Sequence, residues 1–253
     1  MYHKIMPRPK DRALYPNMAC TVFADEFEKQ LAYLKGKYCI LSAEDFISCI
    51  HNGLTFPEKS VFLTFDDGQS DFYEHALPIL KKLRIPAIVF LPTDFIGKDI
   101  VFWWDELEHY ILNMKKDFQE ISGVLVKKGK ERCAFDKLAR ILMSCSFEEK
   151  RGKLNAIKEK LCASNYLGKR SAMTWNEVKE AAESGISFGA HTKGHVLLSS
   201  VSDEQAKKEI SEPKLIIEQH TSFKVKLSYK TVLAFAFSVT SKNAGIFMAS
   251  LGF

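Results

Sequence analysis

The chain has 253 residues, 46% of them hydrophobic, which fits a globular protein with a sizeable core and argues against disorder. Its 36 basic and 31 acidic residues leave a formal charge of +5, and the two signs are mixed along helical patterns. Mixed charges of this kind are typical of solvated helix faces, so we expect no nucleic-acid partner.

The first half of the chain alternates helix and strand patterns, which is typical of α/β proteins. The expected elements are helices over 23–37, 42–53 and 71–83 and strands over 61–65 and 86–92. Ser42 is placed to cap its helix. The strand between the two prolines is a short apolar run, as in buried parallel sheets. This order predicts a βαβ unit with Asp66 and Asp67 at the carboxyl end of its first strand.

From residue 103 to about 170 the pattern changes to successive helices with no convincing strand. No linker rich in proline, glycine or serine separates this segment, so we expect a helical insertion within a single domain over 1–253. A helix then begins after Thr174, which forms a capping-box pattern with Glu177. The remaining expected elements are a strand over 186–190, a helix over 202–220, an apolar run over 232–237 and a helix over 243–253.

Six cysteines are present, none in a CxxC pair, so neither a zinc ribbon nor a redox dithiol is indicated. They lie in apolar or helical patterns, and we expect buried free thiols in a reducing compartment. Residues 1–12 lack the apolar stretch of a signal peptide, and no run is long enough to span a membrane. The sequence as given predicts a cytoplasmic location, unless its N-terminus is incomplete.

Two adjacent carboxylates, Asp66 and Asp67, end the apolar strand and precede Gly68. Like charges at a buried edge are costly unless a cation lies between them. Successive strand residues point to opposite faces, but Gly68 lets the backbone turn so that both carboxylates can reach one pocket. The pair is therefore either a solvated turn or part of a site.

Two histidines, His191 and His195, follow the later strand four residues apart. Position 192 is threonine, which excludes the HExxH motif of metalloproteases because the catalytic glutamate is missing. Alone, the pair could be ordinary surface histidines. Both clusters, however, follow strands, and ligands bind at the carboxyl ends of parallel strands. Two imidazoles and one carboxylate would form a catalytic metal set, and the second carboxylate would take a proton from water.

The motifs TFDDG (64–68) and HTxxH (191–195) resemble those of the polysaccharide deacetylase family, the NodB-homology domain of carbohydrate esterase family 4. The segments YHKI, LPTDFIG and FWWDELE agree with this resemblance in type and order. The resemblance extends from Tyr2 to about Glu218. It implies an α/β fold of the distorted (β/α) barrel type, incomplete in this chain, with the helical insertion at 103–170.

Carried over by position, the resemblance implies that Asp67, His191 and His195 bind a divalent metal ion and that Asp66 is the catalytic base. Zinc is the expected ion, with cobalt or nickel as alternatives. The implied reaction removes N-acetyl groups from amino sugars of an N-acetylated glycan, releasing acetate. The ion would polarise the amide carbonyl and acidify water, and Asp66 would accept the proton.

Two features depart from the family pattern. The third family motif resembles FAYPYG, whereas residues 235–243 read FAFSVTSKN. The sequence also ends where further strands are expected, and these would include the histidine that acts as general acid in the family. No residue is matched to that role, and nothing in the spacing of His3 requires it to line the pocket. The pattern implies missing C-terminal strands and self-association through exposed edges.

Three functions therefore remain open. The first is a metal-dependent deacetylase of N-acetylated glycans. The second is a catalytically impaired or inactive truncated homologue that retains the metal site, because loss of a general acid commonly costs about 100- to 10,000-fold in rate. The third is a metal-dependent amidase that acts on another linear amide.

Overall fold

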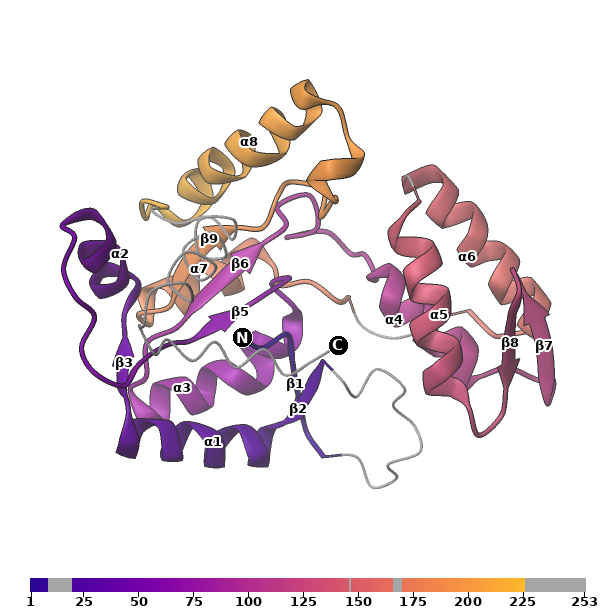
Figure 1. Cartoon of the computed structure of the whole chain (residues 1–253), viewed down its shortest axis with the longest axis horizontal. Helices are drawn as coiled ribbons and strands as arrows, with labels where there is room; N and C mark the ends of the chain where they lie inside the picture. Colours follow the sequence, from indigo (N-terminus) through magenta and orange to yellow (C-terminus); the bar gives the residue numbers. More distant parts are fainter. Residues whose placement is uncertain (9–19, 146, 166–169, 226–253) are drawn as a thin grey trace. The chain divides into compact units, whose positions relative to one another are not determined.

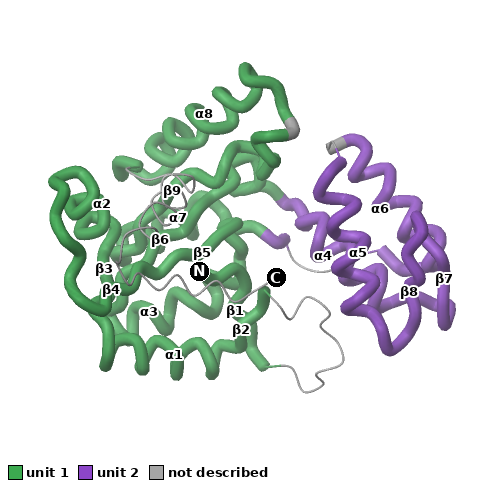
Figure 2. Tube along the Cα trace, viewed as in Figure 1, with its two compact units in different colours: residues 1–8, 20–98, 172–253 green, residues 9–19, 99–171 purple. Residues whose placement is uncertain are grey.

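The structure is a computed structural model that describes residues 1–8, 20–145, 147–165 and 170–225 (Figure 1). By its internal contacts the chain divides into two compact units (Figure 2). Unit 1 comprises Met1–Arg8, Cys20–Lys98 and Ala172–Phe253, and unit 2 comprises Pro9–Ala19 and Asp99–Ser171. The expectation of a single domain with a helical insertion stays a prediction. The apolar run over 232–237, the helix over 243–253 and the FAFSVTSKN stretch lie outside the described residues.

In the described part of unit 1, all paired strands are parallel. The three sheets pair β1 (Lys4–Met6) with β2 (Thr21–Phe23), β3 (Cys39–Leu41) with β4 (Ser60–Phe62), and β5 (Thr64–Phe65) with β6 (Ile88–Leu91) and then β9 (Ser187–Ala190). An isolated parallel bridge joins Tyr2 to Phe65. Within the described part of the chain no sheet closes on itself, so the unit is an open α/β assembly rather than a closed barrel.

The central strand β6 explains why the apolar run between two prolines is a strand. All four of its residues are buried, as expected for a parallel strand covered on both faces. Its first residue, Ile88, pairs with Thr64 of β5 on one side and Ser187 of β9 on the other. Because all three strands run in the same direction, the residues that follow β5 and β9 lie at one edge of the sheet.

The helices of unit 1 match the sequence patterns closely. They are α1 (Ala24–Lys37), α2 (Ala43–His51), a π-helix (Phe72–Ala76) that continues as α3 (Leu77–Leu83), α7 (Trp175–Glu183), a short 3₁₀ turn (Leu198–Ser200) and α8 (Asp203–Thr221). Ser42 and Thr174 cap α2 and α7 as predicted, each in a complete capping box with Asp45 and Glu177 respectively.

The first strand of unit 1 is held by a buried polar contact and by aromatic packing. The backbone N–H of Ile5 donates to Asp71 Oδ2 at 2.7 Å. The ring of Tyr2, just before this strand, lies 5.0 Å from that of Phe27 in an edge-to-face arrangement and 5.4 Å from that of Phe65, on which it stacks. These contacts fix the start of the chain beside the carboxyl end of β5.

Unit 2 corrects the expectation of helices alone. Beside α4 (Trp103–Leu112), α5 (Glu131–Met143) and α6 (Phe147–Leu161) it contains an antiparallel hairpin of β7 (Phe118–Ile121) and β8 (Val124–Lys127). Ile121, Val124 and Val126 are buried while their neighbours along β8 are exposed, which is the period of a half-buried strand. The turn residues Ser122 and Gly123 have φ of 50° and 75°, as a two-residue hairpin turn requires.

The core of unit 2 is apolar, and a buried polar link lies beside it. Leu107, Val126 and Leu138 belong to its largest buried cluster, which joins the three helices to the hairpin. Ser171 donates from its hydroxyl to Asp105 at 2.6 Å, and the same hydroxyl accepts the Phe102 N–H at 3.1 Å. This link ties the beginning of the segment to its end.

The cysteines are free, as expected, but none of the six is buried. Three are exposed and three are half-buried. Cys20, Cys145 and Cys162 lie outside the helices and strands, and the other three lie on positions of their elements that do not face the core. None of the helices that the structure describes is both long enough and apolar enough to cross a bilayer. The cytoplasmic location stays a prediction.

The hairpin turn gives a paired stability test. Gly123→Ala should lower the free energy of unfolding by about 1–2 kcal/mol, because alanine is strained at positive φ and a Cβ there would meet nothing within 4 Å. Gly152→Ala, in the exposed middle of α6 and equally uncrowded, should raise it by about 1 kcal/mol. Urea unfolding of the full chain measures both. Shifts of the same sign would contradict the turn assignment.

Candidate metal centre

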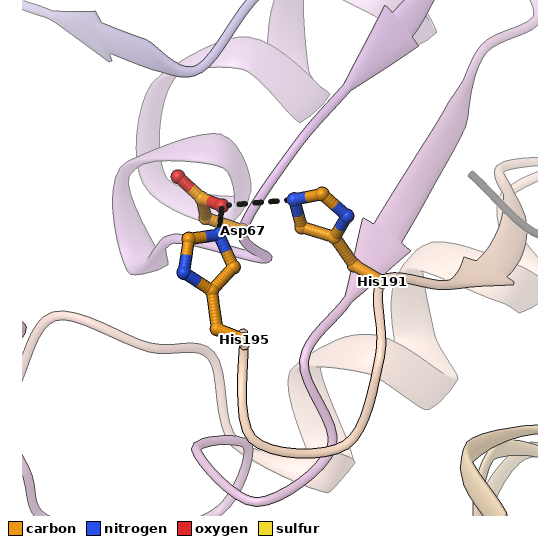
Figure 3. A group of neighbouring side chains, drawn as sticks. All are labelled: Asp67, His191 and His195. Atoms are coloured by element: carbon orange, nitrogen blue, oxygen red, sulfur yellow. Dashed lines mark ion pairs between the residues drawn. The ribbon is translucent and has the colours of Figure 1, made fainter. Parts of the chain in front are cut away.

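Three of the four predicted site residues come together at the carboxyl edge of the β5–β6–β9 sheet. Asp67 comes two residues after the end of β5, and His191 directly follows β9. The backbone N–H of His191 still donates to Leu91 at 3.0 Å, so the sheet register reaches the site itself. A short loop then brings His195 back toward Asp67 (Figure 3).

The contacts among the three side chains converge on one oxygen. Asp67 Oδ1 lies 3.0 Å from His195 Nε2 and 3.4 Å from His191 Nε2 (Figure 3). The imidazole centroids are 4.9 Å apart and the rings are steeply inclined at 68°. One donor atom from each of the three residues lies within 4.8 Å of the other two. This is the spacing that a single shared ion needs.

The donor set fits a divalent metal ion. Asp67 is only 5% exposed, and its Oδ1 accepts no hydrogen bond of good geometry from the residues that the structure describes. Burying a carboxylate oxygen without such a bond is costly unless a cation neutralises it. Two imidazoles and one carboxylate are the protein ligands of many catalytic metal sites, with further positions left for water and substrate.

The electrostatics of the site favour metal binding. Burial raises the pKa of Asp67, but the charges that His195 and His191 can carry outweigh it and hold that pKa well below its usual range. Burial lowers the pKa of His191, against the opposing effect of Asp67. At neutral pH the set therefore offers an ionised carboxylate and a neutral imidazole, which are the protonation states that metal ligands need.

The backbone at the site is strained in several places. Asp67, Thr192 and His195 have φ of 70°, 61° and 54°, in the left-handed region that residues with a side chain rarely adopt. Gly68 has φ of 58°, and a Cβ there would lie 2.5 Å from Leu91 Cδ2. Both the positive φ and the close approach of Leu91 favour glycine at position 68. Strain of this kind clusters at functional sites, where it fixes side chains in unusual directions.

Asp66 lies apart from the three-residue group and faces a histidine that received no role from the sequence. Asp66 is 2% exposed, and its Oδ2 lies 3.8 Å from His3 Nε2. The bridge between Tyr2 and Phe65 brings His3 there, because the N–H of Asp66 donates to the Tyr2 carbonyl at 3.0 Å. In the sequence, His3 is distinguished only by its place in the strand-like segment at the start of the chain.

The pKa of His3 reflects this crowded position. Burial lowers it, the nearby Asp67 raises it, and His191 and His195 lower it further. The net direction is downward, so His3 is readily deprotonated near neutral pH. His3 thus belongs electrostatically to the same group as the three clustered residues.

Comparisons with known proteins identify chains that this one resembles. The sequence matches the polysaccharide deacetylase family over residues 53–123 and 158–250, which include Asp66, Asp67, His191 and His195. A poly-β-1,6-N-acetyl-D-glucosamine N-deacetylase of Staphylococcus epidermidis is 40% identical over 78 residues, 30% of this chain and 27% of that protein. Its Staphylococcus aureus counterpart is 38% identical over 80 residues, 31% and 27% of the two chains. The matched region thus spans about a quarter of these relatives.

Solved structures share the fold at low sequence identity. The Streptococcus pyogenes deacetylase PplD, in complex with acetate, aligns with a TM-score of 0.55 and 20% identity over 94% of this chain and 77% of its own. IcaB from Ammonifex degensii aligns with a TM-score of 0.51 and 16% identity over 89% and 71%. The expected α/β fold, an incomplete (β/α) barrel of the NodB-homology type, is thereby confirmed. With well over half of its residues matched, this chain belongs to the polysaccharide deacetylase family.

Proposed function

We propose that this chain removes N-acetyl groups from amino sugars of a polysaccharide or oligosaccharide in a metal-dependent hydrolysis. The observation that carries this proposal is the convergence of Asp67, His191 and His195 on one buried oxygen, with Asp66 and His3 beside it. Membership of the polysaccharide deacetylase family supports the reaction class. Because the matched relatives act on poly-β-1,6-N-acetyl-D-glucosamine by name, that polymer is the first substrate to test.

The proposed ligands are Asp67, His191 and His195, and zinc is the proposed ion, with cobalt and nickel as alternatives. A divalent ion bound there would supply Lewis acidity, which polarises an amide carbonyl and acidifies water. The residues contribute a single negative charge, because only Asp67 is anionic when the imidazoles are neutral. The ion would therefore retain net positive charge toward the substrate.

Asp66 is the proposed general base. Its carboxylate is buried beside the ligand set but does not belong to it, so it remains able to accept a proton. As water attacks the acetyl carbonyl, Asp66 accepts the water proton. A base must lie within about 3 Å of that proton's oxygen, or one water away, and the position of Asp66 directly before the ligand Asp67 supports this role.

His3 is the proposed proton donor to the departing amine nitrogen. Its Nε2 lies 3.8 Å from Asp66 Oδ2, and because burial lowers its pKa the protonated form that donates is a minority at neutral pH and grows as the pH falls. In this scheme the C–N bond breaks as the amine gains a proton from His3, while the acetyl carbon keeps the oxygen from water. His3 is thus our candidate for the general acid, to which no residue was matched in the sequence.

The metal set can be tested directly. Purified full-length protein should bind about one divalent ion per chain. Asp67→Asn and His191→Ala should each weaken binding by more than about 100-fold, since loss of a mere hydrogen-bonding partner of a ligand costs 10- to 100-fold. The exposed His51 at the end of α2 supplies a matched control, and His51→Ala should bind like the wild type. Isothermal titration calorimetry with Zn²⁺ and Co²⁺ measures the affinities. Equal affinity in the wild type and all three variants would exclude this site.

The base can be tested separately from the ligands. Asp66→Asn should lower the rate of acetate release from N-acetylglucosamine oligomers by about 100- to 10,000-fold, because it removes the proton acceptor. Metal affinity should stay within a few-fold of the wild type, because Asp66 is outside the ligand set. Wild-type protein that binds metal but releases no acetate would favour the inactive homologue. Release only from other linear amides would favour the amidase.

His3→Gln tests the proposed donor. The substitution keeps a polar side chain of similar reach but cannot supply a proton of the required acidity, so the deacetylation rate should fall by about 100-fold or more. Bound metal should be retained. Steady-state kinetics should place the loss in kcat rather than KM, and an unchanged kcat would remove His3 from the mechanism.

A further inference from the structure

The loop between the two histidines is short and strained, yet it must hold both imidazoles toward Asp67 (Figure 3). Thr192 and His195 both have positive φ without being glycine. From the β6 side the loop is held by the Asp94 N–H, which donates to the Lys193 carbonyl at 2.9 Å. A strained loop relaxes unless its surroundings over-determine its conformation.

A single buried carboxylate supplies the second anchor. Glu209, on α8, is only 3% exposed. Its Oε2 accepts the backbone N–H groups of both Lys193 and Gly194, each at 2.8 Å. Its Oε1 accepts from the Gln205 side chain at 2.9 Å. The polar atoms of this buried side chain are therefore satisfied, and two of its three bonds go to the loop.

The placement of these bonds matters more than their number. Lys193 and Gly194 are the two residues between Thr192 and His195, so fixing both N–H groups fixes the peptide planes 192–193 and 193–194 within the loop. Successive backbone N–H groups that point the same way form a concavity suited to an anion. A charged acceptor makes each of these bonds stronger than a neutral one would.

The neighbouring Glu212 provides a contrast on the same helix. It pairs with the side-chain ammonium of Lys193 at 2.6 Å, at a partly exposed position. That contact joins the same helix to the same loop residue without touching its backbone. Surface ion pairs of this kind contribute little, so Glu212 cannot replace Glu209.

We propose that Glu209 is a positioning residue for the metal centre, which holds the His191–His195 loop in its strained conformation and so preorganises both imidazoles for one ion. The proposal rests on the metal site of the proposed function. The hydrogen bonds from the loop to Glu209 come from the backbone N–H groups of Lys193 and Gly194, so Glu209 acts on the histidines through that backbone.

Three variants of the full-length chain separate positioning from general stability. Glu209→Met keeps length and volume but removes the acceptor, and should weaken Zn²⁺ binding by roughly 10- to 100-fold. Glu209→Gln keeps an acceptor oxygen for both N–H groups, with Gln205 free to flip its amide, and should recover most of the affinity. Glu212→Ala should bind Zn²⁺ within about twofold of the wild type, because its contact is a surface ion pair. The visible absorption of bound Co²⁺ reports the ligand geometry and should change only in Glu209→Met.

Hydrogen exchange in the metal-free proteins gives an independent readout. The amides of Lys193 and Gly194 should be protected in the wild type, Glu209→Gln and Glu212→Ala, and should exchange faster in Glu209→Met. If the wild type binds no metal, the proposed function fails, while the exchange pattern still decides whether Glu209 orders the loop. A folded Glu209→Met protein with wild-type Zn²⁺ affinity and wild-type exchange would overturn the proposal.

Discussion

The buried Asp67 carboxylate is the constraint around which the rest of the site is arranged. One of its oxygens faces two imidazole nitrogens at 3.0 and 3.4 Å, in a position that is almost closed to solvent. An anion so placed destabilises the fold unless positive charge meets it. The strained φ at Asp67, the glycine at position 68 and the return of the loop at His195 all serve this one convergence.

The parallel sheet converts a long separation in sequence into contact. Asp67 and His191 lie in different halves of the chain, but β5 and β9 flank the same strand and end at the same edge. The fold therefore brings these side chains near one another, and the local backbone conformation sets the direction in which each points. Glu209 acts on the local backbone, because from α8 it accepts two hydrogen bonds from the strained loop that follows β9.

Features that depend on local pattern were predictable from the sequence, and features that depend on tertiary pairing were not. The capping boxes at Ser42 and Thr174 and the buried strand β6 follow from neighbouring residues. The motifs of Asp67 and His191 were expected to lie close together because the carboxyl ends of parallel strands meet at one edge of a sheet. The hairpin over 118–127 was missed because its two strands are only four residues long and lie between segments with a helical pattern.

The position of His3 depends on the pairing of Tyr2 with Phe65, which no local pattern specifies. Glu209 has the pattern of a surface position in a charged helix, and only the folded structure reveals that it is buried and accepts bonds from residues 193 and 194. The expectation of buried cysteines was wrong because hydrophobic neighbours in sequence do not ensure a core-facing side chain. Self-association through exposed edges stays a prediction.

The central claim is that one ion is shared by Asp67, His191 and His195. A crystal structure of the Zn²⁺-loaded protein, with anomalous diffraction recorded at the zinc edge, tests it most directly. The account predicts one strong anomalous peak about 2.0–2.2 Å from the Asp67 oxygen and from one nitrogen of each imidazole. A peak elsewhere, or none at this site together with a hydrogen-bonded Asp67 Oδ1, would contradict it.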